Sequence, residues 1–174
     1  VEHAEADDVI ATLCHEHGRQ LGGDPILILS GDKDFQQLQR YSNVSQYDPT
    51  RKKWIKCNNP EDFLQEHILK GDTGDGIPNV LSSDDTFVAN ARQKPLRSKK
   101  MEELKMLHFW DWADDVNKNY QRNRMLIDLN AVPDRIRAAT KKAVEEQEGK
   151  GRDKLFNYFI KYKLKNLTEC ISEF

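Results

Sequence analysis

The chain has 174 residues, of which 37% are hydrophobic and 32% are charged, and its formal net charge is −2. This length suits one domain or two small ones, and the composition is polar but sufficient for a core. No apolar run approaches the roughly 20 residues of a membrane span and no signal-peptide pattern opens the chain, so we expect no membrane partner. The three scattered cysteines form no CxxC pair, which is typical of reduced thiols in a cytoplasmic protein.

The charge is unevenly distributed along the chain. Residues 1–50 carry 3 Lys or Arg against 9 Asp or Glu, whereas residues 51–174 carry 24 against 20. An acidic N-terminal part and a mildly basic remainder fit a metal site beside a surface that binds the phosphates of a nucleic acid. Two ordinary domains of differing pI would show the same imbalance.

The first 58 residues follow an α/β pattern. Apolar residues at helical spacing predict a helix over residues 4–17. The continuous apolar run Ile26-Leu27-Ile28-Leu29 lies between turn signals and predicts a strand buried on both faces, as in a parallel sheet. A short helix is expected from residue 35, and residues 44–47 and 53–56 predict a hairpin. We therefore interpret residues 1–58 as part of an α/β domain.

From residue 59 to residue 174 the pattern is helical, which predicts a second domain. Helices are expected over residues 60–69, 101–107, 119–127, 134–144 and 153–162. Residues 83–85 are expected to cap a short helix that reaches residue 88, and residues 93–100 are expected to form a loop. Three aromatic residues, Phe109, Trp110 and Trp112, are expected to pack in a core.

Acidic residues gather at three places in the chain. They are Glu5, Asp7 and Asp8 at the start of the first helix, Asp32 and Asp34 just beyond the predicted strand, and Asp72 and Asp75 within the glycine-rich stretch 71–79. Ligands of open α/β sheets bind beyond the carboxyl ends of the strands, which is where the second cluster falls. Carboxylates without a His or Cys pattern suit Mg²⁺ or Mn²⁺, and two such ions about 3.5–4 Å apart are a standard device for phosphodiester hydrolysis.

Each cluster also has an ordinary structural explanation. Acids at a helix start complement the helix dipole, Asp34 could cap the helix that follows it, and the acids of the glycine-rich stretch could be turn residues. His67, four residues before Gly71, gives no convincing sign of being a ligand. The three clusters in this order, with this placement relative to the strand, favour a shared site.

Three motifs carry a resemblance to a known family. They are Glu5-Ala6-Asp7-Asp8, then Ser30-Gly31-Asp32-Lys33-Asp34-Phe35, then Gly71-Asp72-x-x-Asp75-x-Ile77-Pro78. In this order they resemble the flap endonuclease/5′-nuclease family, in its T-even phage ribonuclease H branch. The resemblance implies the C-terminal part of a PIN/5′-nuclease-like parallel-sheet domain, followed by a helical domain with a helix–three-turn–helix DNA-binding element.

The resemblance also implies roles for individual residues. Catalytic metal ligands would be Glu5, Asp7, Asp8, Asp32 and Asp34, and Asp72 and Asp75 would contribute to the second of two Mg²⁺ or Mn²⁺ ions. The glycines Gly71, Gly74 and Gly76 would form a turn that grips duplex DNA, with a K⁺ ion bound there. Lys70, Arg51, Lys52 and Lys53 are the basic residues expected to contact phosphates.

A metal-dependent 5′-nuclease is the function that follows from these expectations. It would act on duplex DNA with a 5′ flap or nick and on RNA–DNA hybrids, and would remove RNA primers during replication in the host cytoplasm. Its protein partners would be replication proteins such as a sliding clamp or a single-strand-binding protein. Because the family's first strand and helical arch have no counterpart here, we expect a fragment with an incomplete site. The alternatives are a duplex-DNA-binding module without catalysis and a purely structural α/β fragment.

Overall fold

The structure, a computed structural model, describes residues 1–18, 23–107, 111–147, 152 and 154–173. It divides into two compact units, residues 1–140 and residues 141–174, which are described separately. The predicted domain boundary between residues 58 and 59 falls inside the first unit and stays a prediction.

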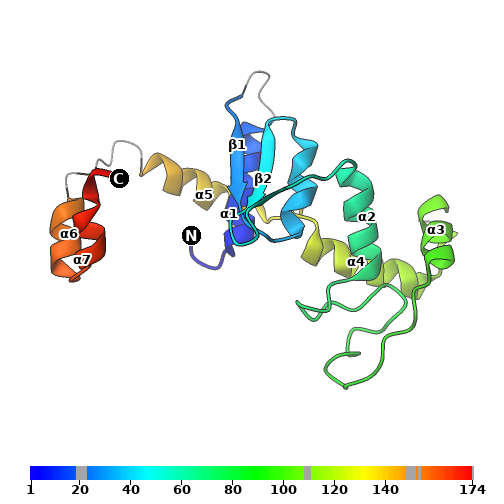
Figure 1. Cartoon of the computed structure of the whole chain (residues 1–174). Helices are drawn as coiled ribbons and strands as arrows, with labels where there is room; N and C mark the ends of the chain where they lie inside the picture. The colour runs from blue at the N-terminus through cyan, green and yellow to red at the C-terminus, as the bar shows by residue number, and fades with distance from the viewer. Residues whose placement is uncertain (19–22, 108–110, 148–151, 153, 174) are drawn as a thin grey trace. The chain divides into compact units, whose positions relative to one another are not determined.

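The first unit opens with a small mixed sheet and two helical segments (Figure 1). In chain order these are α1 (Ala6–His17), β1 (Ile26–Leu29), the 3₁₀ helix η1 (Asp34–Arg40), β2 (Val44–Asp48) and β3 (Lys53–Ile55). The sheet has the order β1-β2-β3, with β1 parallel and β3 antiparallel to β2. The predicted strand and hairpin are therefore confirmed.

The burial of β1 differs from the expectation. Ile28 is buried, but Leu27 is 50% exposed and Leu29 is 64% exposed. The reason is that Ile28 joins a core with residues of α1, η1 and β2, whereas Leu27 and Leu29 alternate with it along the strand and point to the other face of the sheet, where they stay largely exposed. The prediction of a strand buried on both faces is wrong for this chain.

Four further helices follow in this unit or cross its end: α2 (Pro60–Lys70), α3 (Ser98–Met106), α4 (Asp114–Ile127) and α5 (Asp134–Glu145). α2 begins as its sequence predicts, because Pro60 occupies its first turn and the side chain of Asn59 accepts a hydrogen bond from the Asp62 N–H at 3.1 Å. It packs against η1, α3 and α4. It thus connects the sheet region to the helices that follow.

Two expectations for this region are corrected. Residues 84–90 form consecutive turns instead of a short helix, and the Ser83 hydroxyl is engaged with Asp85 and Thr86. α3 begins at Ser98, inside the stretch expected to be a loop. Trp112 is buried as expected and meets the Tyr120 ring edge-on at 4.8 Å, whereas Phe109 and Trp110 lie outside the described residues.

Two side chains of α4 donate hydrogen bonds to the backbone at the end of α2 and in the segment that follows it. Asn123 is fully buried and donates to the carbonyl oxygens of Ile68 at 2.8 Å and Pro78 at 2.9 Å. Arg122 also donates to Pro78 O at 2.9 Å. These bonds satisfy carbonyl groups that would otherwise be buried without partners.

Asn123→Ala is expected to destabilise the protein by about 2–3 kcal/mol, because it removes two hydrogen bonds and leaves a buried carbonyl without its donor. Urea unfolding would measure the loss. The exposed Gln121, on the same helix, is the matched control, and its alanine variant should change stability by no more than about 0.5 kcal/mol. Equal effects at the two positions would contradict this role for Asn123.

The second unit contains α6 (Leu155–Lys161), α7 (Lys165–Glu169) and the short 3₁₀ helix η3 (Ile171–Glu173). α6 and α7 pack against each other, and Phe159 is buried. No described helix in either unit combines the length and apolar character needed to cross a membrane. All three cysteines are free, as the sequence predicted.

Candidate metal centre

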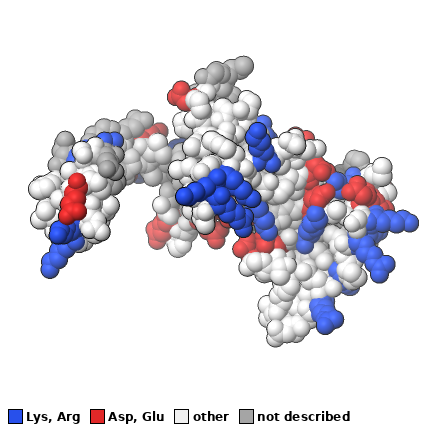
Figure 2. Space-filling model, viewed as in Figure 1, with Lys and Arg blue, Asp and Glu red and all other residues white. Residues whose placement is uncertain are grey.

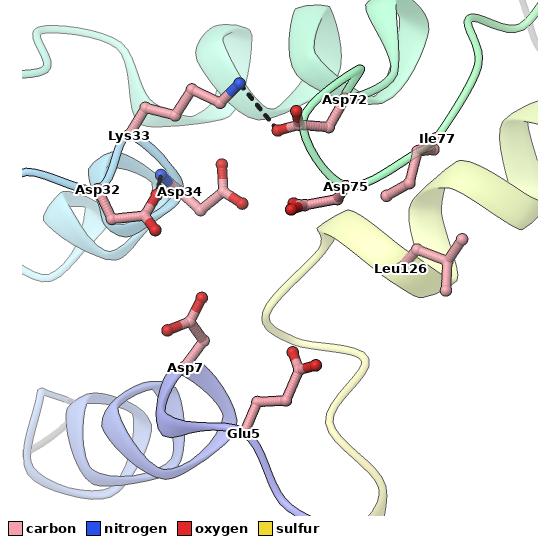
Figure 3. A pocket seen from close by; sticks show the side chains of 9 residues that line it. All are labelled: Glu5, Asp7, Asp32, Lys33, Asp34, Asp72, Asp75, Ile77 and Leu126. Carbon is pink, nitrogen blue, oxygen red and sulfur yellow. Dashed lines mark hydrogen bonds and ion pairs between the residues drawn. The ribbon is translucent and has the colours of Figure 1, made fainter. Parts of the chain in front are cut away.

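An open pocket of about 570 Å³ in the first unit is lined by carboxylates from all three predicted clusters (Figure 3). The lining residues are Glu5, Asp7, Asp32, Lys33, Asp34, Asp72, Asp75, Ile77 and Leu126. The structure thus brings together six of the seven acids singled out from the sequence. They come from three stretches separated by more than 20 residues in each case.

The seventh acid, Asp8, does not line the pocket. Its carboxylate accepts a hydrogen bond from the Glu5 N–H at 3.1 Å and so closes a capping box at the start of α1. This contact fixes the backbone of Glu5, which does line the pocket. In this structure Asp8 therefore supports the site from α1.

The first turn of α1 presents Asp7 to the other acids. Figure 3 shows its side chain pointing from α1 toward Asp32 and Asp34. Burial, followed by the charges of Asp32 and Glu5, raises the pKa of Asp7 above its usual value. A cation in the pocket would relieve both causes, because it would replace lost hydration and neutralise the neighbouring charges.

The second cluster is positioned by the end of β1 and by a neighbouring strand. The Asp34 N–H donates to Asp32 Oδ1 at 3.0 Å, which is a turn stabilised by an aspartate side chain. From β2, the fully buried Gln46 donates to the carbonyl oxygens of Ser30 at 2.9 Å and Asp32 at 2.6 Å. The backbone that carries these two acids is therefore held rigidly beyond the carboxyl end of β1.

Asp34 is the acid most affected by its surroundings. Burial raises its pKa to about 6, against the opposing effect of His67 and with a further increase from Asp32. Because this folded-state pKa exceeds the ordinary value near 4, ionisation of Asp34 costs the folded protein stability as the pH rises from about 4 to 6. The cost is up to about 3 kcal/mol at neutral pH.

Asp34→Asn is therefore expected to stabilise the metal-free protein at pH 7 by an amount that disappears near pH 4. Thermal unfolding in EDTA between pH 4 and pH 7 would measure the difference. The variant Asp24→Asn, at an exposed position, is the control and should follow the wild-type curve. A variant less stable than the wild type at every pH would contradict the assignment.

The glycine-rich loop places the third cluster. Gly71 ends α2 with φ 68° and ψ −174°, a conformation essentially restricted to glycine. The loop then closes as Ile77 N–H donates to Asp72 O at 2.7 Å, and the Gly74 N–H donates to Asp72 Oδ1 at 2.9 Å. Asp72 is consequently buried and directed into the pocket, while Asp75 is exposed at its rim.

Two residues that the sequence reading did not assign to the site contact these acids. Lys33 Nζ lies 2.8 Å from Asp72 Oδ2. His67 of α2 is buried, with Nε2 3.1 Å from Asp72 Oδ2 and Nδ1 3.3 Å from Asp34 Oδ1. One feature of the sequence could have indicated that His67 is buried. It lies three residues after Leu64, which places it on the apolar side of its helix.

These contacts balance the charge on Asp72. Burial alone would raise its pKa, but hydrogen bonds from Lys33, the Gly74 N–H and His67 outweigh it and lower the pKa below its usual value. The hydrogen bond to Asp72 in turn raises the pKa of Lys33. Asp72 is therefore held as a carboxylate, and Asp34, His67 and Asp72 together form a group able to hold a metal ion.

The basic residues expected to contact phosphates lie outside the pocket lining. Arg51, Lys52 and Lys53 are exposed around the β2–β3 turn, and Figure 2 shows Lys and Arg side chains gathered over this hairpin. Lys70 is exposed at the end of α2 and pairs with Glu66 at 2.5 Å. Both groups are accessible to a ligand.

Comparison with known proteins identifies the family. The model of the "T4 RNase H, C terminal" family matches residues 59–174. Ribonuclease H of Enterobacteria phage T4 is 33% identical over 186 residues, which cover 100% of this chain and 59% of the phage protein. The flap endonuclease Xni of Shewanella oneidensis is 36% identical over 85 residues, covering 44% of this chain and 31% of Xni. The chain therefore belongs to the T4 RNase H family of 5′-nucleases.

Solved structures show the same fold. T5 5′-exonuclease superposes with a TM-score of 0.56 over 84% of this chain and 67% of its own, at 19% sequence identity. A T5 protein co-crystallised with metal ions gives the same TM-score over 85% of this chain and 62% of its own. The fold is thus a mixed α/β fold like that of T5 5′-exonuclease. The chain spans about 59% of the T4 relative that it matches.

Proposed function

We propose that this chain is part of a metal-dependent 5′-nuclease that cleaves 5′ flaps, nicked duplex DNA and RNA–DNA hybrids, and so removes RNA primers during replication. One observation carries the proposal. Six carboxylates from three separate stretches of the chain converge on one pocket, in a member of a 5′-nuclease family. Such a concentration of negative charge is costly unless cations neutralise it.

The residues of the pocket fit divalent cations. Buried Asp34 Oδ1 has no hydrogen-bond partner, and a bound ion would satisfy it. We infer that Asp7, Asp32 and Asp34, with Glu5, Asp72 and Asp75 around them, hold two Mg²⁺ or Mn²⁺ ions. When bound, such ions activate a water molecule and stabilise charge on the scissile phosphate. The T5 protein co-crystallised with metal ions is consistent with this inference.

The protein's own residues would orient the substrate and the ions. Asp8 holds the backbone of Glu5, Gln46 holds that of Asp32, and Gly74 N–H holds the carboxylate of Asp72. Such supporting contacts fix the carboxylates before substrate arrives, which limits the reorganisation that the reaction requires.

We further propose that the glycine-rich loop grips the duplex next to the pocket. The segment from α2 through Gly71, Gly74 and Gly76 would act as the turn of a helix–three-turn–helix element, with K⁺ as its bound cation. Arg51, Lys52, Lys53 and Lys70 would contact the phosphates of the duplex. Binding through these contacts should weaken steeply with salt. A sliding clamp or a single-strand-binding protein would deliver the enzyme to its substrate.

A second function, duplex-DNA binding without catalysis, is favoured by one observation, which is that Arg51, Lys52 and Lys53 are exposed around the β2–β3 turn, outside the acidic pocket. Titrating Mg²⁺ and Mn²⁺ against a labelled 5′-flap substrate would separate the two. The chain itself and a longer version that supplies the part of the family it does not span should both be assayed. We expect cleavage to require the metal. If both versions bind the flap substrate in a salt-sensitive, metal-independent way and neither cleaves it, the proposed nuclease function is overturned.

A further inference from the structure

His67 occupies an unusual position between two of the acids. Its side chain is 7% exposed, and its two ring nitrogens face different carboxylates, Nε2 toward Asp72 and Nδ1 toward Asp34. The ring also meets Phe63 edge-on, with 5.7 Å between ring centroids. The imidazole is therefore held in one orientation by packing as well as by charge.

The two contacts of the ring differ in kind. Both oxygens of Asp72 are hydrogen-bonded, Oδ1 to the Gly74 N–H and Oδ2 to Lys33 and to His67 Nε2. With Nε2 as the donor, a neutral imidazole keeps a lone pair on Nδ1. His67 Nδ1 and Asp34 Oδ1 are both buried atoms without a hydrogen-bond partner, and they face each other at 3.3 Å.

Two buried acceptors at this distance repel each other, and a cation between them would satisfy both. Donors that each lie about 2.1 Å from one ion, and 3.3 Å from each other, subtend an angle of about 100° at it. This angle lies between the octahedral and tetrahedral values. The spacing is thus that of neighbouring ligands of a single metal ion.

Resting on the metal-dependent nuclease proposed above, we propose that His67 is a metal ligand, binding one ion through Nδ1 together with Asp34. Asp72 then contributes to the site by orienting the ring through Nε2. A ligating histidine whose other nitrogen donates to a carboxylate is a recurrent arrangement in metal sites. Neither the acidic motifs nor the family comparison assigns His67 to the site.

This ligand changes the ion that the position prefers. Sites made of carboxylates and water suit Mg²⁺, whereas an imidazole nitrogen favours the transition metals. The position held by Asp34 and His67 should therefore select Mn²⁺ over Mg²⁺. A second position, lined by Asp7 and Asp32, keeps oxygen ligands alone and suits either ion.

Electron spin-echo spectroscopy of the chain with substoichiometric Mn²⁺ tests the proposal, because it detects nitrogen bound directly to the ion. We expect ¹⁴N coupling in the wild type and in His17→Gln, which alters an exposed histidine at the far end of α1. His67→Gln, whose amide can still donate to Asp72, should lose the coupling. Its Mn²⁺ affinity should fall about 10–100-fold, while its Mg²⁺ affinity changes less than about threefold.

The wild-type spectrum is informative even if the variant does not fold. Bound Mn²⁺ without nitrogen coupling would overturn the proposal, since the ion would then be held by oxygen ligands alone. The proposed nuclease function would still stand after that result if cleavage requires the metal. Absence of any saturable Mn²⁺ binding would overturn this inference and the metal assignment together. Nitrogen coupling without cleavage by the longer protein would support His67 as a ligand and overturn the nuclease.

Discussion

Asp32→Asn is expected to reduce metal-dependent cleavage of a 5′-flap substrate by more than about 100-fold, which is the upper range of loss for a residue that only orients a metal ligand. Asparagine keeps the side-chain oxygen that accepts the Asp34 N–H at 3.0 Å, so the turn beyond β1 should survive. What is lost is one negative charge in the pocket. Single-turnover rates at saturating Mg²⁺, measured in the longer protein, would give the effect.

Asp24, which precedes β1 and does not line the pocket, provides the matched control. Asp24→Asn removes an equal charge and should leave the rate within about twofold of the wild type, as most exposed positions tolerate substitution. Binding of the uncleaved flap in Ca²⁺ or EDTA should be at least as tight in Asp32→Asn, because less negative charge then faces the phosphates. Full activity of Asp32→Asn would contradict a catalytic role for the second cluster.

Much of the site could be predicted because its parts are local in the sequence. The apolar run before Asp32 indicated a strand, and a strand's carboxyl end is where ligands bind in open α/β sheets. Glycines packed with Asp72 indicated a turn that needs unusual backbone angles, and Gly71 and Gly76 do have positive φ. The order of the acidic clusters and their placement relative to the strand favoured a shared site, but no spacing rule connects residues so far apart, and only the family resemblance implied a metal-binding role for each of them.

What could not be predicted depends on contacts between distant elements. His67 reads as one apolar-side residue of α2, and its contacts arise only when η1 brings Asp34 against that helix. The two faces of β1 could not be distinguished either, because a continuous apolar run looks the same whether one face or both are covered. Asp8 resembled a ligand by its motif, but in this structure its carboxylate accepts the Glu5 N–H and does not line the pocket.

Gly71→Ala is expected to unfold or strongly destabilise the loop that carries Asp72 and Asp75. At φ 68° and ψ −174° the backbone conformation alone costs a non-glycine residue about 1–3 kcal/mol. A Cβ atom there would also lie 2.4 Å from Ile77 O and 2.7 Å from Pro78 O. Both atoms belong to the backbone that closes the loop, so relief requires breaking the Asp72–Ile77 pairing. We expect a total loss above about 3 kcal/mol.

Gly76→Ala separates strain from close contact. Gly76 also has a positive φ, 74°, but a Cβ atom there would meet nothing within 4 Å. Its alanine variant should therefore cost only the conformational penalty, about 1–2 kcal/mol. Urea unfolding of both variants, with Mn²⁺ affinity measured alongside, would give the comparison. Gly71→Ala should lower both the stability and the Mn²⁺ affinity, because the loop positions Asp72. Equal destabilisation by the two variants would show that the close approach of Gly71 to residues 77 and 78 is not what holds the loop.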